Sequence, residues 1–95
     1  MQVVKQRLYE KQKNKLVSRH ILTRQQIDEA EELLKTDPLH HKLRPHNITC
    51  KKDKRRRSIS IQNTAYRILY TDGGEKAIFQ QILDHDDYNR INKDC

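Results

Sequence analysis

The chain has little of what a thick hydrophobic core requires. Only 34% of its 95 residues are hydrophobic, and tryptophan is absent. Such a chain fits one small domain spanning residues 1–95, with a single sheet covered by helices on one face. No apolar run approaches the roughly 20 residues that cross a membrane, and the N-terminus has no apolar signal segment. We therefore expect a cytoplasmic protein with no membrane association.

Cysteine is also scarce, because Cys50 and Cys95 are the only two in the chain. They form no C-x-x-C pair, which argues against a disulfide framework and a zinc ribbon, and free thiols in a reducing compartment are the expectation. The histidines His40, His41 and His46 precede Cys50, but their spacing matches no zinc pattern. The sequence therefore predicts no metal site.

Charge, in contrast, is abundant and mainly positive. The chain has 20 Lys+Arg against 13 Asp+Glu, a net charge of +7. Segment 51–57 is predicted to be a solvated hairpin tip or strand edge, and its charge density indicates contact with a phosphate backbone. Its candidate RNA-binding residues are Lys51, Lys52, Lys54, Arg55, Arg56 and Arg57. Charge alone does not decide whether the polyanionic partner is a nucleic acid or an acidic protein.

Two helices are predicted in the N-terminal half. The first, residues 7–18, has a sparse apolar stripe through Leu8 and Leu16. The second begins after Thr23, the expected N-cap, and Gln26 three residues later completes a capping box. It should end at residue 36, since the next residue precedes a proline.

The remaining elements are predicted to be strands, at residues 2–6, 46–52, 57–62, 65–72 and 76–84. The last strand is apolar on both faces, with Ile78 and Ile82 on one and Phe79 and Leu83 on the other, which is typical of a central strand. This order predicts an α+β domain in which two N-terminal helices pack on one face of a twisted, mainly antiparallel sheet of four to five strands. The other face is left partly open. One core should contain Ile27, Leu33, Ile59, Ile61, Ile68, Ile78 and Ile82.

One charge stands inside an apolar strand. Arg67 lies between Tyr66 and Ile68, and a guanidinium on a rigid sheet is suited to gripping phosphate. Pairing with an Asp or Glu across the sheet is an equally open interpretation. His85 follows the last strand within an acidic cluster, where histidine suits proton transfer near neutral pH, although the cluster also fits a polar strand end. The polar tail after residue 89 is expected to fray.

Four segments have a familiar combination of residues: LHHKL (39–43), RSISI (57–61), AYRILY (65–70) and DHDDY (84–88). Together they resemble the RelE/ParE superfamily of bacterial toxins, the small basic proteins of type II toxin–antitoxin pairs, over nearly the whole chain. The resemblance implies a twisted antiparallel sheet with two N-terminal helices, and a cognate antitoxin as partner. Many members cut mRNA on the ribosome without a metal or other cofactor, and the attacking group is the 2′-hydroxyl of the RNA itself.

The resemblance implies catalytic roles for Arg67, His85, Tyr88 and His41. Arg67 would grip the scissile phosphate, and His85 would act as general acid or base. Tyr88 matches a C-terminal aromatic that stacks on or orients the nucleotide. His41 matches a histidine that one subgroup uses.

The chain also departs from the family pattern. Ser58 and Ser60 stand where active ribosome-dependent members often carry basic groups. ParE-type members lack the nuclease constellation and poison DNA gyrase instead. The leading hypothesis is therefore an mRNA endoribonuclease toxin, while a gyrase-directed toxin, or an inactive relative that binds only its antitoxin and operator DNA, stays open.

Overall fold

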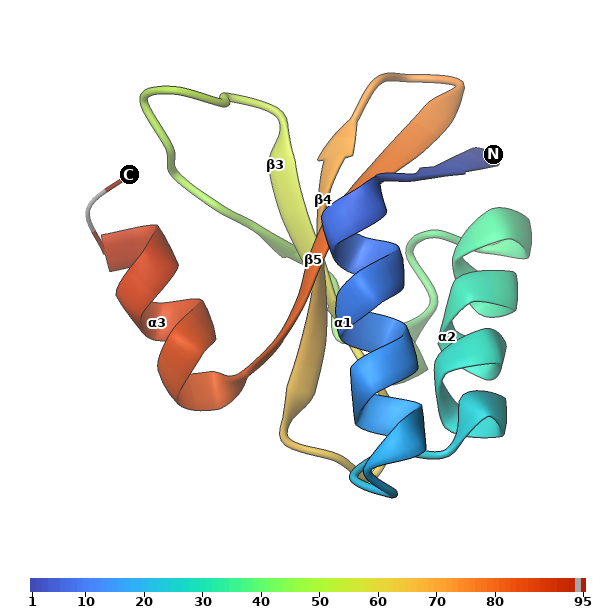
Figure 1. Ribbon diagram of the computed structural model, residues 1–95. Coiled ribbons are helices and arrows are strands. Elements are labelled where there is room, and N and C mark those ends of the chain that lie inside the picture. Colours follow the sequence, from blue (N-terminus) through green and yellow to red (C-terminus); the bar gives the residue numbers. More distant parts are fainter. Residues whose placement is uncertain (94) are drawn as a thin grey trace.

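The computed structural model describes residues 1–93 and residue 95. The elements follow one another as β1 (Gln2–Lys5), α1 (Arg7–Ser18), α2 (Arg24–Thr36), the short 3₁₀ helix η1 (His41–Leu43), β2 (His46–Asn47), β3 (Arg56–Ser60), β4 (Tyr66–Asp72), β5 (Lys76–Asp84) and α3 (His85–Lys93). Helices α1 and α2 lie together on one side of the sheet, and α3 lies on the other (Figure 1). The predicted α+β fold is confirmed. None of the helices described has the length and apolar character needed to cross a membrane.

The sheet has the strand order β1-β5-β4-β3-β2. The pairs β2–β3, β3–β4 and β4–β5 are antiparallel, and the N-terminal β1 adds to β5 in parallel. Strand β4 therefore lies at the centre of the sheet, between β5 and β3. This position matters for the site, because β4 carries Arg67.

The N-terminus of α2 has the predicted capping box. The backbone N–H of Gln26 donates to Thr23 Oγ1 at 3.1 Å, and the backbone N–H of Thr23 donates to Gln26 Oε1 at 3.0 Å. The helix ends at Thr36, as predicted. Its buried apolar residues Ile27, Ala30 and Leu34 face the sheet.

The core lies between the two N-terminal helices and the sheet. Ile27, Ile59, Ile61, Ile68 and Ile82 belong to it as predicted, and Leu33 packs against it half-buried.

The predicted assignment of the β5 side chains to the two faces is wrong. Leu69 pairs with Gln81 and Tyr70 with Phe79, so Gln80 is an extra residue that is opposite no residue of β4 in the pairing register, and it forms a bulge. The extra residue places Phe79 and Ile82 in the same core and leaves Ile78 outside it. Period-two alternation cannot predict such a shift.

The buried face of α1 also differs from the predicted stripe. Leu8 is 50% exposed, whereas Tyr9 and Lys13 are buried. The Tyr9 hydroxyl donates to Glu31 Oε2 on α2 at 2.6 Å. Lys13 Nζ donates to Asp28 Oδ1 at 2.7 Å and contacts Glu31 Oε2 at 3.1 Å. A buried polar network therefore joins α1 to α2, while Leu16 of the predicted stripe packs half-buried against the core.

The C-terminal part of the chain differs most from the sequence prediction. The tail expected to fray forms α3, which extends to Lys93. The predicted strand at 46–52 shrinks to His46–Asn47, and the segment after it is a loop. Cys50 and Cys95 form a disulfide, with their Cα atoms 4.6 Å apart, so the expectation of free thiols is wrong for this structure. Helix α3 returns the end of the chain to the loop after β2, and sequence spacing gives no sign of this.

Candidate functional site

Arg67 lies half-buried on β4, on the face of the sheet opposite α1 and α2. Its side chain donates to three neutral oxygens. Nε and Nη2 both donate to Ser58 Oγ, at 3.2 and 3.0 Å. Nη1 donates to Ser60 Oγ at 2.7 Å, and Nη2 also donates to the carbonyl oxygen of Arg44 at 3.0 Å. The register explains this, because Ser60 pairs with Arg67 across β3 and β4 and Ser58 is on the same face.

No carboxylate pairs with Arg67 in the part of the chain that the structure describes, although six ion pairs form elsewhere in it. Burial lowers the pKa of the Arg67 guanidinium, Tyr88 opposes this, and the nearby positive charge of Arg44 lowers it further. A guanidinium nevertheless stays charged at neutral pH. The site therefore holds a half-buried cation among neutral partners, which favours an incoming anion. The carboxylate pairing left open by the sequence is not found.

Tyr88 reaches the same group from α3. Its ring centroid lies 5.2 Å from Cζ of Arg67, a cation–π contact. Its hydroxyl is hydrogen-bonded to Ser58 Oγ at 2.9 Å. Ser58 is fully buried and so joins Arg67 and Tyr88. The structure brings these two predicted site residues together, with Ser58 as their common partner.

The two predicted histidines lie apart from this contact. His85 is exposed in the first turn of α3, and its Nε2 is hydrogen-bonded to Nδ2 of Asn89 at 3.2 Å. No hydrogen bond joins His85 to Arg67 among the residues described. His41 is exposed on η1 and stacks on His40 with ring centroids 4.5 Å apart.

A polar hollow of about 550 Å³ has His41 in its wall. It lies between η1 and the β3–β4 turn, and Ser60 and Arg44, both bonded to Arg67, form part of its wall. Cationic groups are present in this wall and carboxylates are not. The lining residues are His41, Lys42, Arg44, Ser60, Ile61, Gln62, Asn63, Thr64 and Ala65.

The basic run 51–57 divides into two kinds of side chain. Lys51, Lys52, Lys54 and Arg55 are exposed and make no ion pair in the described structure. Its last two residues are engaged within the molecule. Arg56 Nη1 donates to Asn92 Oδ1 at 3.4 Å and to Cys95 Sγ at 3.2 Å, and Arg57 Nε lies 3.4 Å from Asp72 Oδ2.

No protein-family model and no curated protein sequence matches the chain. Solved structures do match its fold. The toxin–antitoxin complex DinJ–YafQ of E. coli matches with a TM-score of 0.72 and 17% identity, over 90% of this chain and 92% of that chain. A YoeB/ParE toxin from Agrobacterium tumefaciens matches with a TM-score of 0.69 and 16% identity, over 90% of this chain and 99% of that chain. A copper-bound mutant toxin from Helicobacter pylori matches with a TM-score of 0.73 and 17% identity, over 92% of this chain and 97% of that chain. The chain has the fold of the RelE/ParE toxins.

Within this RelE/ParE fold, sequence reasoning missed two parts of the site. Arg44 supplies a carbonyl to Arg67 from a left-handed backbone with φ 45°, just before Pro45. Ser58 and Ser60 are direct partners of Arg67, although the sequence suggests them only as departures from the active pattern. The isoleucine–serine alternation places both serines on the face away from the core, but only the β3–β4 register aligns them with Arg67.

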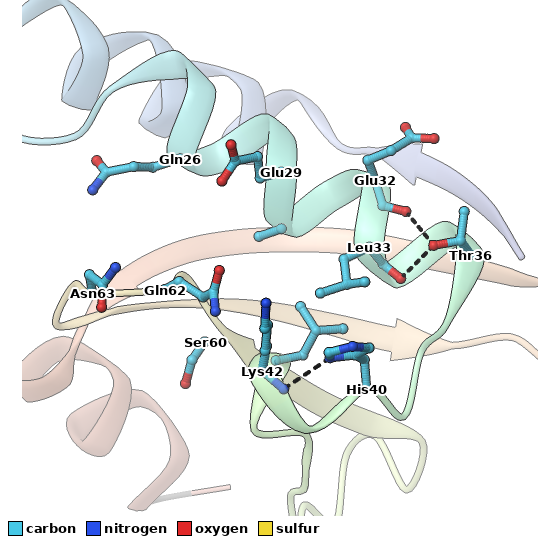
Figure 2. A pocket seen from close by; sticks show the side chains of 12 residues that line it. Gln26, Glu29, Glu32, Leu33, Thr36, His40, Lys42, Ser60, Gln62 and Asn63 are labelled. Carbon is cyan, nitrogen blue, oxygen red and sulfur yellow. Dashed lines mark hydrogen bonds between the residues drawn. The ribbon is translucent and has the colours of Figure 1, made fainter.

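The protein has a second, more apolar hollow of about 430 Å³ between α2 and the β3–β4 turn. Figure 2 shows the side chains of Glu29 and Glu32 on its α2 side and Lys42 and His40 on the opposite side. The two carboxylates disfavour a phosphate backbone at this hollow. The polar hollow beside Arg67 is the better candidate for a nucleotide.

Proposed function

We propose that this protein is the toxin of a toxin–antitoxin pair and that it cleaves mRNA on the ribosome without a metal. The observation that carries the proposal is Arg67, a half-buried cation with neutral partners and an aromatic ring over its face, in the RelE/ParE toxin fold. The sequence resemblance supplies the reaction.

In the proposed reaction the 2′-oxygen of the RNA attacks the adjacent phosphorus, and the bond to the 5′-oxygen breaks. The products are a 2′,3′-cyclic phosphate and a free 5′-hydroxyl. One group must take the 2′-hydroxyl proton and another must give a proton to the leaving oxygen. We assign these roles to His85 and His41, which are both exposed, and assign stabilisation of the charged phosphorane to Arg67. Tyr88 would orient the nucleotide by stacking.

The RNA strand would extend from this site toward the exposed cations of the basic run. Lys51, Lys52, Lys54 and Arg55 lie in the loop between β2 and β3, and their side chains are available to phosphates. Arg56 and Arg57 would contribute less, since both already have partners within the protein.

The proposed regulatory partner is a protein antitoxin. The likeness to the DinJ–YafQ toxin–antitoxin complex supports this, and the net charge of +7 favours an acidic or amphipathic segment that folds on binding.

The test is cleavage of mRNA on programmed ribosomes. Arg67→Ala should abolish cleavage, because charge stabilisation that acts mainly in the transition state is lost. His85→Gln should slow cleavage by about 10²–10⁴-fold, because the group that transfers a proton is lost. His20→Gln is the matched control, since His20 is exposed in the turn between α1 and α2, and it should cleave like the parent.

Thermal melts must accompany this assay, because Arg67 also has structural hydrogen bonds. Arg67→Lys keeps the charge but loses the planar fork, so a folded Arg67→Lys protein with little cleavage supports the proposed role. Parent-like cleavage by both Arg67→Ala and His85→Gln would reject this site.

A gyrase-directed or purely binding toxin is the second candidate. One observation favours it: four of the hydrogen bonds of Arg67 already go to Ser58, Ser60 and the Arg44 carbonyl, which leaves few donors for a phosphate. Toxicity without RNA cleavage, together with gyrase-trapped DNA, would favour this candidate.

A further inference from the structure

Helix α3 covers Arg67. Tyr88 places its ring 5.2 Å from the guanidinium carbon and its hydroxyl 2.9 Å from Ser58 Oγ. Ser58 accepts two hydrogen bonds from Arg67. An anion approaching Arg67 from the α3 side meets the aromatic ring first, so access from that side depends on the position of α3.

The helix has few contacts of its own that hold it there. None of its nine residues is buried. The carboxylate of Asp84 caps its first turn by accepting from the Asp87 backbone N–H at 2.9 Å, and Arg56 reaches Asn92 with a long hydrogen bond of 3.4 Å. A helix of this length is marginal in water without tertiary packing.

The disulfide supplies the missing restraint. It joins Cys95, just beyond α3, to Cys50 in the loop before β3. Cys50 is 4% exposed, and its loop is fixed to the sheet because the N–H of Ile48 donates to the Arg56 carbonyl at 3.0 Å. Since β5 leads directly into α3, the disulfide is the covalent tie at the other end of the helix, where the remaining restraints are two long hydrogen bonds, from Arg56 to Asn92 at 3.4 Å and from the Lys51 N–H to the Cys95 carbonyl at 3.5 Å.

We propose that the Cys50–Cys95 pair is a redox-modification site that controls access to Arg67. A dithiol reductant would attack one sulfur, form a mixed disulfide and leave as its own cyclic disulfide. Two electrons and two protons pass to the protein, and Cys50 and Cys95 become thiols. Helix α3 then detaches at its C-terminal end and uncovers Arg67. The movement of α3 does not depend on the proposed function. Only the identity of the anion that reaches Arg67, an RNA phosphate, rests on it.

The first measurement is hydrogen exchange of the oxidised and reduced protein. Reduction should make the amides of α3 exchange at least about tenfold faster, because the restrained helix gains a local opening. The amides of β4 should keep their protection. Cys95→Ser should match the reduced parent and should not respond to reductant, which separates loss of the bond from other effects of the reagent.

The second measurement reads access to Arg67 without RNA. Phenylglyoxal modifies arginine side chains, and peptide mass spectrometry gives a rate for each site. Arg67 should react several-fold faster after reduction, whereas Arg19, exposed at the end of α1, should react at the same rate in both states.

Three results would overturn the proposal: α3 amides that ignore reduction, β4 amides that lose protection together with α3, or an Arg67 rate that does not rise. The first result leaves α3 in place, the second makes the disulfide a support of the whole fold, and the third leaves Arg67 covered. Failure of the proposed nuclease has a different signature, which is faster Arg67 modification after reduction but intact mRNA.

Discussion

Ser58 illustrates how one side chain can change meaning between sequence and structure. By the sequence resemblance it stands where active RelE/ParE toxins often have a basic group. In the fold its buried hydroxyl is the common partner of Arg67 and Tyr88. A neutral acceptor at this point lets β4 hold a cation without a carboxylate that would neutralise it.

Removal of this hydroxyl should therefore be costly. Ser58→Ala should lower the free energy of unfolding by about 1–3 kcal/mol, because half-buried donors of Arg67 lose their acceptor. Ser60→Ala is the matched comparison, since Ser60 Oγ accepts a single hydrogen bond from Arg67, and it should cost about 1 kcal/mol. Urea melts measure both values. Equal losses in the two variants would contradict a special role for Ser58.

The buried carboxylate of Glu31 makes a prediction about pH. Burial alone would raise the pKa of the Glu31 carboxyl, but hydrogen bonds from Tyr9, Lys5 and Lys13 outweigh it and hold the pKa below its ordinary value. The stability that Glu31 contributes is therefore complete above about pH 4.3 and is lost as the pH falls through the lowered pKa of the folded state.

Glu31→Gln should cost about 3 kcal/mol at pH 7, because it leaves the buried Lys13 ammonium with a weaker set of partners. The difference from the parent should shrink as the pH falls below about 4. Denaturant melts at a series of pH values measure this. Glu29→Gln, at an exposed position of the same helix, should stay within about 0.5 kcal/mol of the parent. A loss that does not change with pH would show that the charge of Glu31 is not responsible.

At the scale of elements, the sequence predicted what periodicity and capping can encode. The bounds of α1, the capping box and end of α2, and the three antiparallel strands all follow local signals. The assignment of β5 side chains to the two faces could not be predicted in this way, because the bulge at Gln80 depends on pairing with β4. Helix α3 could not be predicted either, since it buries no residue and so has no apolar pattern to detect. Its position is set by contacts distant in sequence, including the disulfide.

The capping box offers a test at this scale. Thr23→Ala should lower the free energy of unfolding by about 1 kcal/mol, because an N–H in the first turn of α2 loses its acceptor. Thr49→Ala is a suitable control, since Thr49 is exposed in the loop after β2. Thermal or urea melts distinguish the two variants. Equal stability of the two proteins would mean that the cap does not hold the helix.

At the scale of the whole molecule, the positive charge is unevenly used. Several cations are occupied within the protein, among them Lys13 between two carboxylates and Arg57 beside Asp72. The exposed cations of the loop between β2 and β3 are not paired in the described structure. Helix α1, which lies across the sheet from α3 (Figure 1), carries a second set of exposed cations. The net charge of +7 therefore does not identify the face that meets a polyanion.

Salt dependence can separate the two sets of cations. If RNA follows the loop, changing Lys51, Lys52 and Lys54 together to glutamine should weaken binding of a single-stranded RNA and reduce the slope of log K against log salt by about two to three units. The control changes Lys11, Lys15 and Arg19 to glutamine. This control lowers the net charge of +7 by the same amount, but the charges it removes lie along α1 and at its C-terminal end. It should therefore leave the slope nearly unchanged. Filter-binding or fluorescence titrations from low to moderate salt give both slopes. Equal reductions of the salt slope in the two triple variants would mean that RNA binding responds only to the net charge. A local contact with phosphates requires a larger reduction in the loop variant than in the α1 variant.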